Sequence, residues 1–134
     1  MEIINLNDQQ VEELEQGLEE YDKEYIHFKL DGGISIGICE GSRVIAGVDA
    51  CMTAFHILYV STVFVSKEYR RQGLGRKLML ELEERAKQLG ADMIRLDTFD
   101  WQGKAFYESL GYENVGQYEN SKEGFSEYFF LKRL

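Results

Sequence analysis

The 134-residue sequence has no proline, two cysteines, one tryptophan and no long hydrophobic run. Without proline, glycine is left to mark almost every turn. Cys39 and Cys51 fit no Cys-x-x-Cys or metal-ligand spacing, and His27 and His56 stand far apart in the sequence. The sequence therefore predicts no metal site and two reduced cysteines.

No segment approaches the ~18 consecutive apolar residues that would span a bilayer. The N-terminus also lacks the basic region and apolar stretch of a secretion signal. We therefore expect no membrane partner and a cytoplasmic location. The length, with 44% hydrophobic residues, is typical of one globular domain over residues 1–134.

Basic residues are also few, 15 Lys and Arg against 24 Asp and Glu. Nine of the acidic residues lie within residues 1–24, which hold a single basic residue, Lys23, so this segment carries −8 of the total −9. The chain lacks the basic face that phosphate backbones require, and no nucleic-acid partner is expected. The acidic segment is either a solvated face or a means of attracting a cationic amine.

Hydrophobic periodicity predicts alternating helices and strands. A first helix capped by Asn7 or Asp8 carries Val11, Leu14, Leu18 and Tyr21 at three- to four-residue spacing. A short run, Ile26 to Leu30, follows it. The predicted strands are Ile34–Glu40, Arg43–Cys51, Tyr59–Val65, Met93–Thr98, Glu113–Glu119 and Glu127–Leu134, with a two-residue turn at Gly41-Ser42 and a bend near His56.

The clearest element is an amphipathic helix over Leu74–Leu89, which Gly90 ends. Its outer face is expected to hold the i,i+4 pairs Glu81–Arg85 and Glu83–Lys87. A shorter helix is predicted over Gln102–Leu110. The fold class that follows is α/β (α+β), a single-domain mixed, mostly antiparallel sheet with helices on both faces.

Between the strand Tyr59–Val65 and this helix, residues 70–75 read Arg70-Arg71-Gln72-Gly73-Leu74-Gly75. Glycines let the backbone approach a ligand closely, and the first N–H groups of a helix have no internal acceptors. Further basic side chains follow at Arg76 and Lys77. The segment predicts a phosphate-binding turn, but neither a Walker P-loop nor a three-glycine dinucleotide fingerprint.

This segment resembles the acetyl-CoA signature Arg/Gln-x-x-Gly-x-Gly/Ala of the GNAT superfamily of N-acetyltransferases, here Arg70-x-x-Gly73-x-Gly75. A second match, Phe106-Tyr107-x-x-x-Gly111-Tyr112, resembles the family's Phe-Tyr-x-x-x-Gly-Phe helix end. The resemblance covers roughly residues 34–134. It implies a GNAT-like fold and acetyl-CoA as acetyl donor.

The resemblance also implies roles for particular residues. Two parallel strands would splay apart, and the backbone of Val63, Phe64 and Val65 would hold the pantetheine arm. The N–H groups from Arg71 to Arg76, through Gln72, Gly73, Leu74 and Gly75, would meet the pyrophosphate, with added charge from the side chains of Arg70, Arg71 and Arg76. Tyr107 would be the general acid. The alternative for a tyrosine at this position is a structural role, packed between helix and sheet.

Two positions depart from the family pattern. The asparagine that often bonds the cofactor arm is Asp100 here, and the alanine three residues later is Gly103. Asp100 is carried over as a cofactor-binding residue. The general base is left open among Glu127, His56 and a water relay.

The predicted function is transfer of an acetyl group from acetyl-CoA to a primary amine of a small molecule or peptide, with cationic amines among the candidates. A non-catalytic acyl-CoA-binding or interaction module with the same fold is the alternative. A homodimer is left open.

Overall fold

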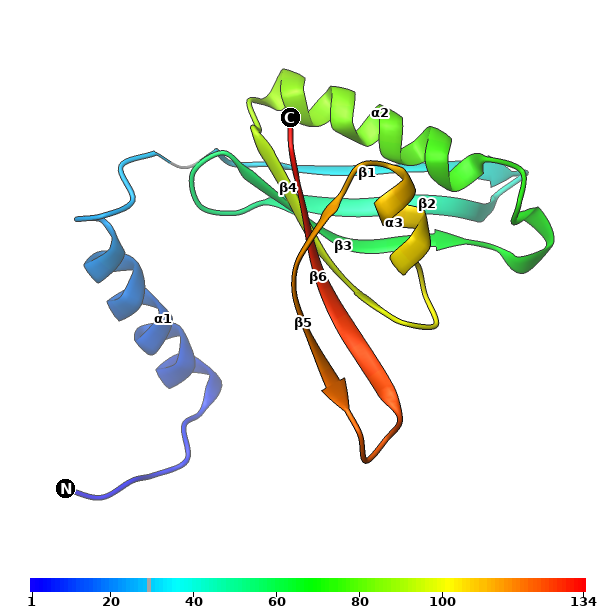
Figure 1. Ribbon diagram of the computed structural model, residues 1–134. Helices are drawn as coiled ribbons and strands as arrows, with labels where there is room; N and C mark the ends of the chain where they lie inside the picture. The colour runs from blue at the N-terminus through cyan, green and yellow to red at the C-terminus, as the bar shows by residue number, and fades with distance from the viewer. Residues whose placement is uncertain (29) are drawn as a thin grey trace.

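The computed structural model describes residues 1–28 and 30–134 (Figure 1). Its elements, in chain order, are α1 (Asp8–Asp22), β1 (Gly33–Glu40), β2 (Arg43–Met52), β3 (Ile57–Val65), a 3-10 turn (Lys67–Tyr69), α2 (Leu74–Leu89), β4 (Met93–Phe99), α3 (Lys104–Ser109), β5 (Glu113–Asn120) and β6 (Phe125–Arg133). The predicted elements are confirmed, with bounds that differ by one to two residues at most ends. Within the described residues, no helix is long and apolar enough to cross a membrane.

The six strands form one sheet in the order β1-β2-β3-β4-β6-β5. β3 and β4 run parallel, and the other neighbouring pairs are antiparallel. The β1–β2 hairpin turns at Gly41-Ser42, as predicted, with Glu40 opposite Arg43. The mixed, mostly antiparallel sheet of the predicted fold class is confirmed.

One face of the sheet carries the core. Alternate residues along each central strand, such as Val48, Val60 and Leu96, are buried on this face. The predicted apolar stripe of α2 packs against them, with Leu82 and Ala86 fully buried. α3 adds the buried side chain of Tyr107 to the same cluster. We call this the inner face and the opposite one the outer face.

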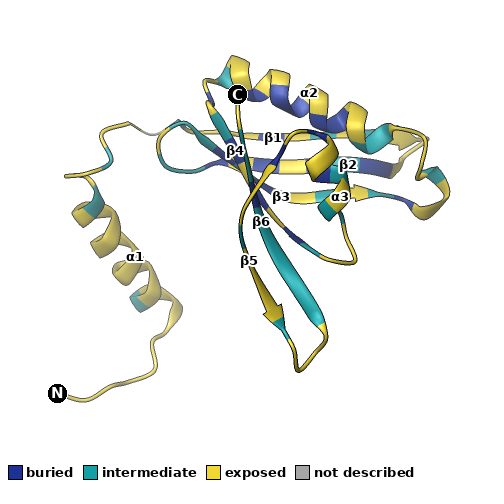
Figure 2. Ribbon diagram, viewed as in Figure 1, coloured by how far each residue is buried: buried dark blue, intermediate teal, exposed yellow. Residues whose placement is uncertain are grey.

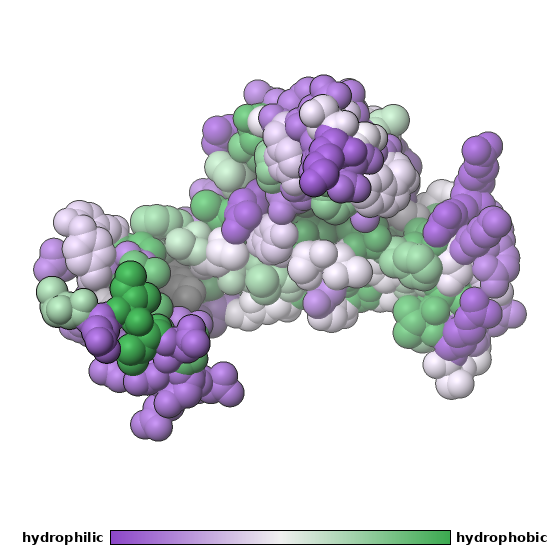
Figure 3. All heavy atoms as spheres, turned by 90° about the horizontal axis from the view of Figure 1, so that it is seen from below, coloured by the Kyte–Doolittle hydropathy of each residue, from purple (hydrophilic) through white to green (hydrophobic). Residues whose placement is uncertain are grey.

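The positions of the helices differ from the prediction, which placed helices on both faces of the sheet. α2 and α3 both cover the inner face, where they contact each other, and α1 covers neither face. α1 begins at the predicted cap, Asn7, whose side chain accepts from the Gln10 N–H in a capping box. Residues 1–27, here called the arm, stand away from the sheet (Figures 1 and 2). None of the residues of α1 is buried. Apolar residues lie open on the arm's surface (Figure 3).

The position of Glu83 differs from the prediction that it pairs with Lys87 on the exposed side of the helix. It lies on the buried side of α2, only 6% exposed, and its carboxylate accepts from Lys132 Nζ of β6 at 2.6 Å. Lys87 instead pairs with Glu84, while the predicted Glu81–Arg85 pair is confirmed. A buried carboxylate needs a charged partner, so Lys132, which also donates to the Leu110 carbonyl, ties β6 to both helices.

The segment between the arm and the sheet meets the bend predicted near His56. Phe28 stacks on His56 with ring centroids 4.2 Å apart, and Leu30 N–H donates to the Phe55 carbonyl. In the run Ile26 to Leu30, the described residues form no strand, and Lys29 lies outside them. The arm therefore leaves the body at the end of the sheet where β3 and β4 begin.

Candidate functional site

The parallel strands β3 and β4 pair over four residues only, from Ile57–Met93 to Val60–Leu96. β3 continues to Val65 and β4 to Phe99 without further pairing between them. A bulge in the β2–β3 ladder at Ser61 marks the point where they part. The splayed strands expected from the family resemblance are therefore present, and they leave backbone groups on both sides of a gap.

The gap leads to the start of α2. Lys77 N–H donates to the Gly73 carbonyl, so the N–H groups before Lys77 have no acceptor within the helix. Arg71 (φ 63°) and Gly73 (φ 78°) both have left-handed backbone conformations, which turn the chain sharply into the helix. The first turn of α2 contains no acidic side chain. This end can receive an anion.

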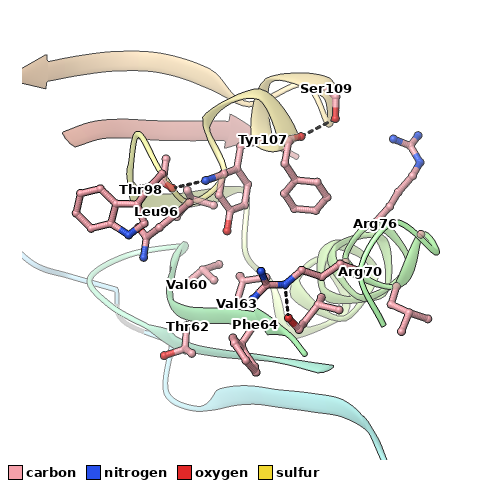
Figure 4. A pocket seen from close by; sticks show the side chains of 18 of the residues that line it. Val60, Thr62, Val63, Phe64, Arg70, Arg76, Leu96, Thr98, Tyr107 and Ser109 are labelled. Atoms are coloured by element: carbon pink, nitrogen blue, oxygen red, sulfur yellow. Dashed lines mark hydrogen bonds between the residues drawn. The ribbon is translucent and has the colours of Figure 1, made fainter. Parts of the chain in front are cut away.

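A cleft of about 1020 Å³ joins the gap to this helix start (Figure 4). It is lined by Val60, Ser61, Thr62, Val63, Phe64, Val65, Tyr69, Arg70, Arg71, Gly73, Leu74, Gly75, Arg76, Leu96, Asp97, Thr98, Trp101, Gln102, Gly103, Phe106, Tyr107 and Ser109. The structure thus brings together Tyr107 and nine of the eleven residues that the sequence assigns to the cofactor.

Tyr107 comes from α3 on the inner side of the gap. Its ring is buried against Tyr112 and Phe130, and its hydroxyl points into the cleft (Figure 4). Burial raises the pKa of Tyr107 to about 12. The hydroxyl is therefore protonated at neutral pH and can donate to a group in the gap.

Thr98 and Gly103 fix the position of Tyr107. The buried Thr98 hydroxyl accepts from Gly103 N–H at 3.1 Å, just before α3 begins. A Cβ on Gly103 would lie 3.0 Å from Cε2 of Tyr107, so glycine gives the ring room that the alanine of the family pattern would restrict. This explains the departure at Gly103.

Two predicted cofactor residues lie elsewhere. Asp100 does not line the cleft, because its carboxylate accepts from Ser126 N–H at 2.9 Å and its own N–H donates to the Ser126 carbonyl. Gln72 also lies outside the cleft lining, and its amide donates to the Glu68 carbonyl at 3.4 Å. Arg70 lines the cleft, where its Nε donates to the Val65 carbonyl at 2.8 Å.

The two side chains considered as the general base lie in different parts of the structure. His56 lies at the far end of β3, where Nδ1 meets the Gly90 carbonyl at 2.9 Å, and it does not line the cleft. Glu127 accepts from the Tyr118 hydroxyl at 2.6 Å and lies opposite Phe99 on β6. Across residues 1–28 and 30–134, no cluster of three or more His, Cys, Asp or Glu could hold a metal ion.

Sequence reasoning missed Asp97. It follows the last paired residue of β4, lines the cleft and accepts from the Tyr59 hydroxyl at 3.1 Å on the outer face. Its place in the alternation of β4, pointing away from the buried Leu96 and Thr98, is a signal that the sequence does contain. The cleft therefore has a hydroxyl on the inner side and a carboxylate on the outer side.

Comparison with known proteins shows which family the sequence matches. A sequence profile described as "Acetyltransferase (GNAT) family" matches residues 2–112. Thialysine N-epsilon-acetyltransferase of Bos taurus is 33% identical over 64 residues, which span 46% of this chain and 38% of that protein. Blasticidin-S acetyltransferase of Streptomyces morookaense is 28% identical over 78 residues, covering 58% of this chain and 57% of that protein. The matches thus span about two fifths to three fifths of these relatives.

A solved structure matches over the whole length. An acetyltransferase from Bacillus cereus superposes with a TM-score of 0.93 at 28% identity, covering 100% of this chain and 98% of that one. The arm is about a fifth of this chain, so a score this high requires the arm to lie in a similar place in that structure.

Proposed function

The chain belongs to the acetyltransferase (GNAT) family, and on this premise we propose that it transfers the acetyl group of acetyl-CoA to a primary amine of a small molecule or peptide. The observation that carries the proposal is the gap between β3 and β4. It opens at Val60 and Leu96, ends at the start of α2, and has Tyr107 on one side and Asp97 on the other.

The residues around the gap fit the donor. The N–H groups from Arg71 to Arg76 would bind its pyrophosphate, with further charge from the side chains of Arg70 and Arg76. The backbone of Val63 to Val65 faces no strand across the gap and would hold the pantetheine arm as an added strand. When bound, acetyl-CoA supplies a thioester whose carbonyl carbon is the site of attack.

The two sides of the gap suit the two proton movements of the reaction. Asp97, on the outer side, would bind the incoming amine, direct its lone pair toward the carbonyl carbon and take up the proton that the nitrogen loses as the C–N bond forms. Tyr107, on the inner side, would give its proton to the sulfur as the C–S bond breaks. Because burial raises the pKa of Tyr107 to about 12, the hydroxyl is protonated before the reaction, and the tyrosinate left by the transfer would regain a proton from solvent.

The outer face also supports a choice of acceptor. Asp49 lies opposite Thr62, a cleft residue, and Asp97 and Glu127 stand on neighbouring strands of the same face. This carboxylate-lined approach would favour an amine that carries further positive charge. Relatives named for acetylating thialysine and blasticidin S are consistent with a small-molecule amine. In a single chain, the acidic helix α1 lies away from this approach.

The test is release of free thiol from acetyl-CoA in the presence of a panel of amines, with wild type, Tyr107→Phe and Tyr112→Phe. Tyr112 is the matched control because its hydroxyl is buried in the same aromatic cluster and does not line the cleft. We expect turnover with the wild type and Tyr112→Phe and a large loss with Tyr107→Phe. Binding of acetyl-CoA without turnover of any amine would favour the non-catalytic module instead.

A further inference from the structure

The arm has an apolar stripe with no partner among the described residues of its own chain. Its exposed apolar side chains are Met1, Ile3, Ile4, Leu6, Val11, Leu14, Leu18, Tyr21 and Tyr25. Leu14, Leu18 and Tyr21 are each more than 60% exposed on one side of α1. An isolated helix of about 15 residues is only marginally stable in water, so α1 needs an apolar surface to pack on.

The outer face of the sheet offers such a surface. Tyr59, Met93 and Leu131 point to this face by their register, and they are half-buried without belonging to the core on the other side. α2 and α3 both pack on the inner face, so within the described residues no helix covers this one. Among the described residues, the outer face therefore presents apolar side chains that no helix covers.

Charge divides this face into two halves. Arg95, 4.4 Å above the Tyr59 ring, and Arg133 flank Met93 and Leu131 at the end where β4 begins. We call Tyr59, Met93, Arg95, Leu131 and Arg133 the basic corner; Glu113 of β5, opposite Leu131, lies at its edge, so two arginines face one carboxylate here. The other half holds Asp49, Asp97 and Glu127 beside the cleft. The arm, with its net charge of −8, is attracted to the first half and repelled by the second.

We propose that the arm of one chain packs on the basic corner of a second copy, and that the second copy returns the same contact. The apolar stripe of α1 would cover Tyr59, Met93 and Leu131, while its acidic flanks would pair with Arg95 and Arg133. The exchange is reciprocal and closes in a twofold dimer.

The position of the arm favours exchange over folding back. Phe28, stacked on His56, fixes the arm's exit at the end of the sheet where the basic corner lies, because Ile57 pairs with Met93 and Met93 with Arg133. From there the arm extends outward (Figures 1 and 3), and the Bacillus cereus acetyltransferase keeps it in a similar place. An arm directed away from its own sheet can reach the same corner of a neighbour.

The size of the arm fits the area that a stable dimer needs, because the exchange would form the same contact twice. A specific interface buries about 800 Å² on each partner. In an exchange, each chain contributes both its arm and its outer face. Tyr21 and Tyr25 alone bury about 150–250 Å² each when fully covered. The contact also leaves the acidic half of the outer face open, so the approach to the cleft stays free.

The first experiment measures the mass of the full chain by sedimentation. We expect wild type at about twice the 15.5 kDa of one chain. Leu14→Gln with Leu18→Gln should sediment as a monomer at the same concentration, and Arg95→Glu should weaken association at least tenfold. None of α1 is buried in its own chain, so the arm variant keeps the fold. The control Leu80→Gln, an exposed leucine of α2, should remain dimeric.

The second experiment identifies the surface that the arm touches. Cys51 is exposed on the outer face, opposite Tyr59, and provides a native thiol beside the basic corner. In a Cys39→Ser background, Leu18→Cys should form a cross-linked species of two chains under mild oxidation, and a further Cys51→Ser change should abolish it.

Three results would overturn the proposal. The wild type could be monomeric at all concentrations. The cross-link could form within one chain, which would mean that the arm folds back on its own sheet. A two-chain species could also persist after Cys51→Ser, which would place the arm elsewhere on the partner.

Discussion

A Cβ atom on Gly75 would lie 3.2 Å from Cζ of Phe106. Gly75 ends the Arg70–Gly75 motif in the first turn of α2, and Phe106 belongs to α3, so the two sequence motifs meet at this contact. Glycine at this position is therefore needed for the close approach of the two helices, as well as for any approach of a ligand. The contact sets the position of α3, which carries Tyr107.

Gly75→Val should separate the two helices. Inserting a branched side chain at a packed contact costs about 1–3 kcal/mol of the free energy of unfolding. We expect a loss in that range by urea denaturation, together with a lower kcat because Tyr107 moves. Phe106→Ala in the Gly75→Val background makes room for the side chain. Phe106→Ala destabilises the chain by itself, so the cost of Gly75→Val is compared with and without it; an equal cost in both backgrounds would mean that the contact is not the cause.

Tyr107→Phe keeps the ring and removes only the hydroxyl. We expect kcat to fall by about ten- to a thousand-fold, the range of acid catalysis, with little change in affinity for CoA. Tyr112→Phe should leave kcat unchanged and should not destabilise the chain, because its buried hydroxyl has no hydrogen-bond partner in the described residues. An unaltered kcat in Tyr107→Phe, where chemistry is rate-limiting, would end the assignment.

Alkaline pH should weaken the fold through the same tyrosine. Burial raises the pKa of Tyr107 from 10.0 to about 12, so between these values the folded chain keeps a proton that the unfolded chain releases. Stability from this group is complete below pH 10 and declines as pH rises toward 12, by on the order of 2–3 kcal/mol. Urea unfolding across this range should show a smaller decline for Tyr107→Phe. Equal declines would show that the phenol titrates normally.

The turn before α2 can be tested by its effect on CoA binding. A ligand bound only to the folded state raises the melting temperature, and Gly73→Glu should abolish this rise by adding negative charge and strain at φ 78°. Gly41→Glu is the matched control, since Gly41 also has positive φ (62°) and open space around it but lies in the β1–β2 turn. A full response to CoA in Gly73→Glu would mean that the phosphate site lies elsewhere.

The buried pair Glu83–Lys132 should have a large effect when only one partner is removed. Lys132→Met leaves the 6% exposed Glu83 carboxylate without its charged partner, which costs about 3–5 kcal/mol in comparable buried pairs. Glu83→Leu with Lys132→Met removes both charges and should recover much of that loss in the free energy of unfolding. Equal losses in the single and double variants would argue against a buried charge as the cause.

The sequence alone was enough to predict the elements and the two motifs. The stripe from Leu74 to Leu89 predicted α2 to the residue, and Gly41-Ser42 predicted the first hairpin, because helical period and turn chemistry are local properties. The family resemblance supplied the gap between two parallel strands, whereas the order of the strands in the sheet came from the structure. The residues of the glycine turn and Tyr107 followed from it, and most of them do line one cleft.

Only the tertiary structure decided which partners these residues meet. Glu83 looked like an outward charge by its spacing to Lys87, but a strand 49 residues away provides Lys132. Asp100 matched a motif position, yet Ser126 takes its carboxylate, while Asp97 reaches the cleft because β3 and β4 part beside it. The arm's apolar stripe was evident in the sequence, but its exposure, with no partner within residues 1–28 and 30–134, was not. Local periodicity specifies which side of an element is apolar, whereas pairing and packing between distant segments decide what that side touches.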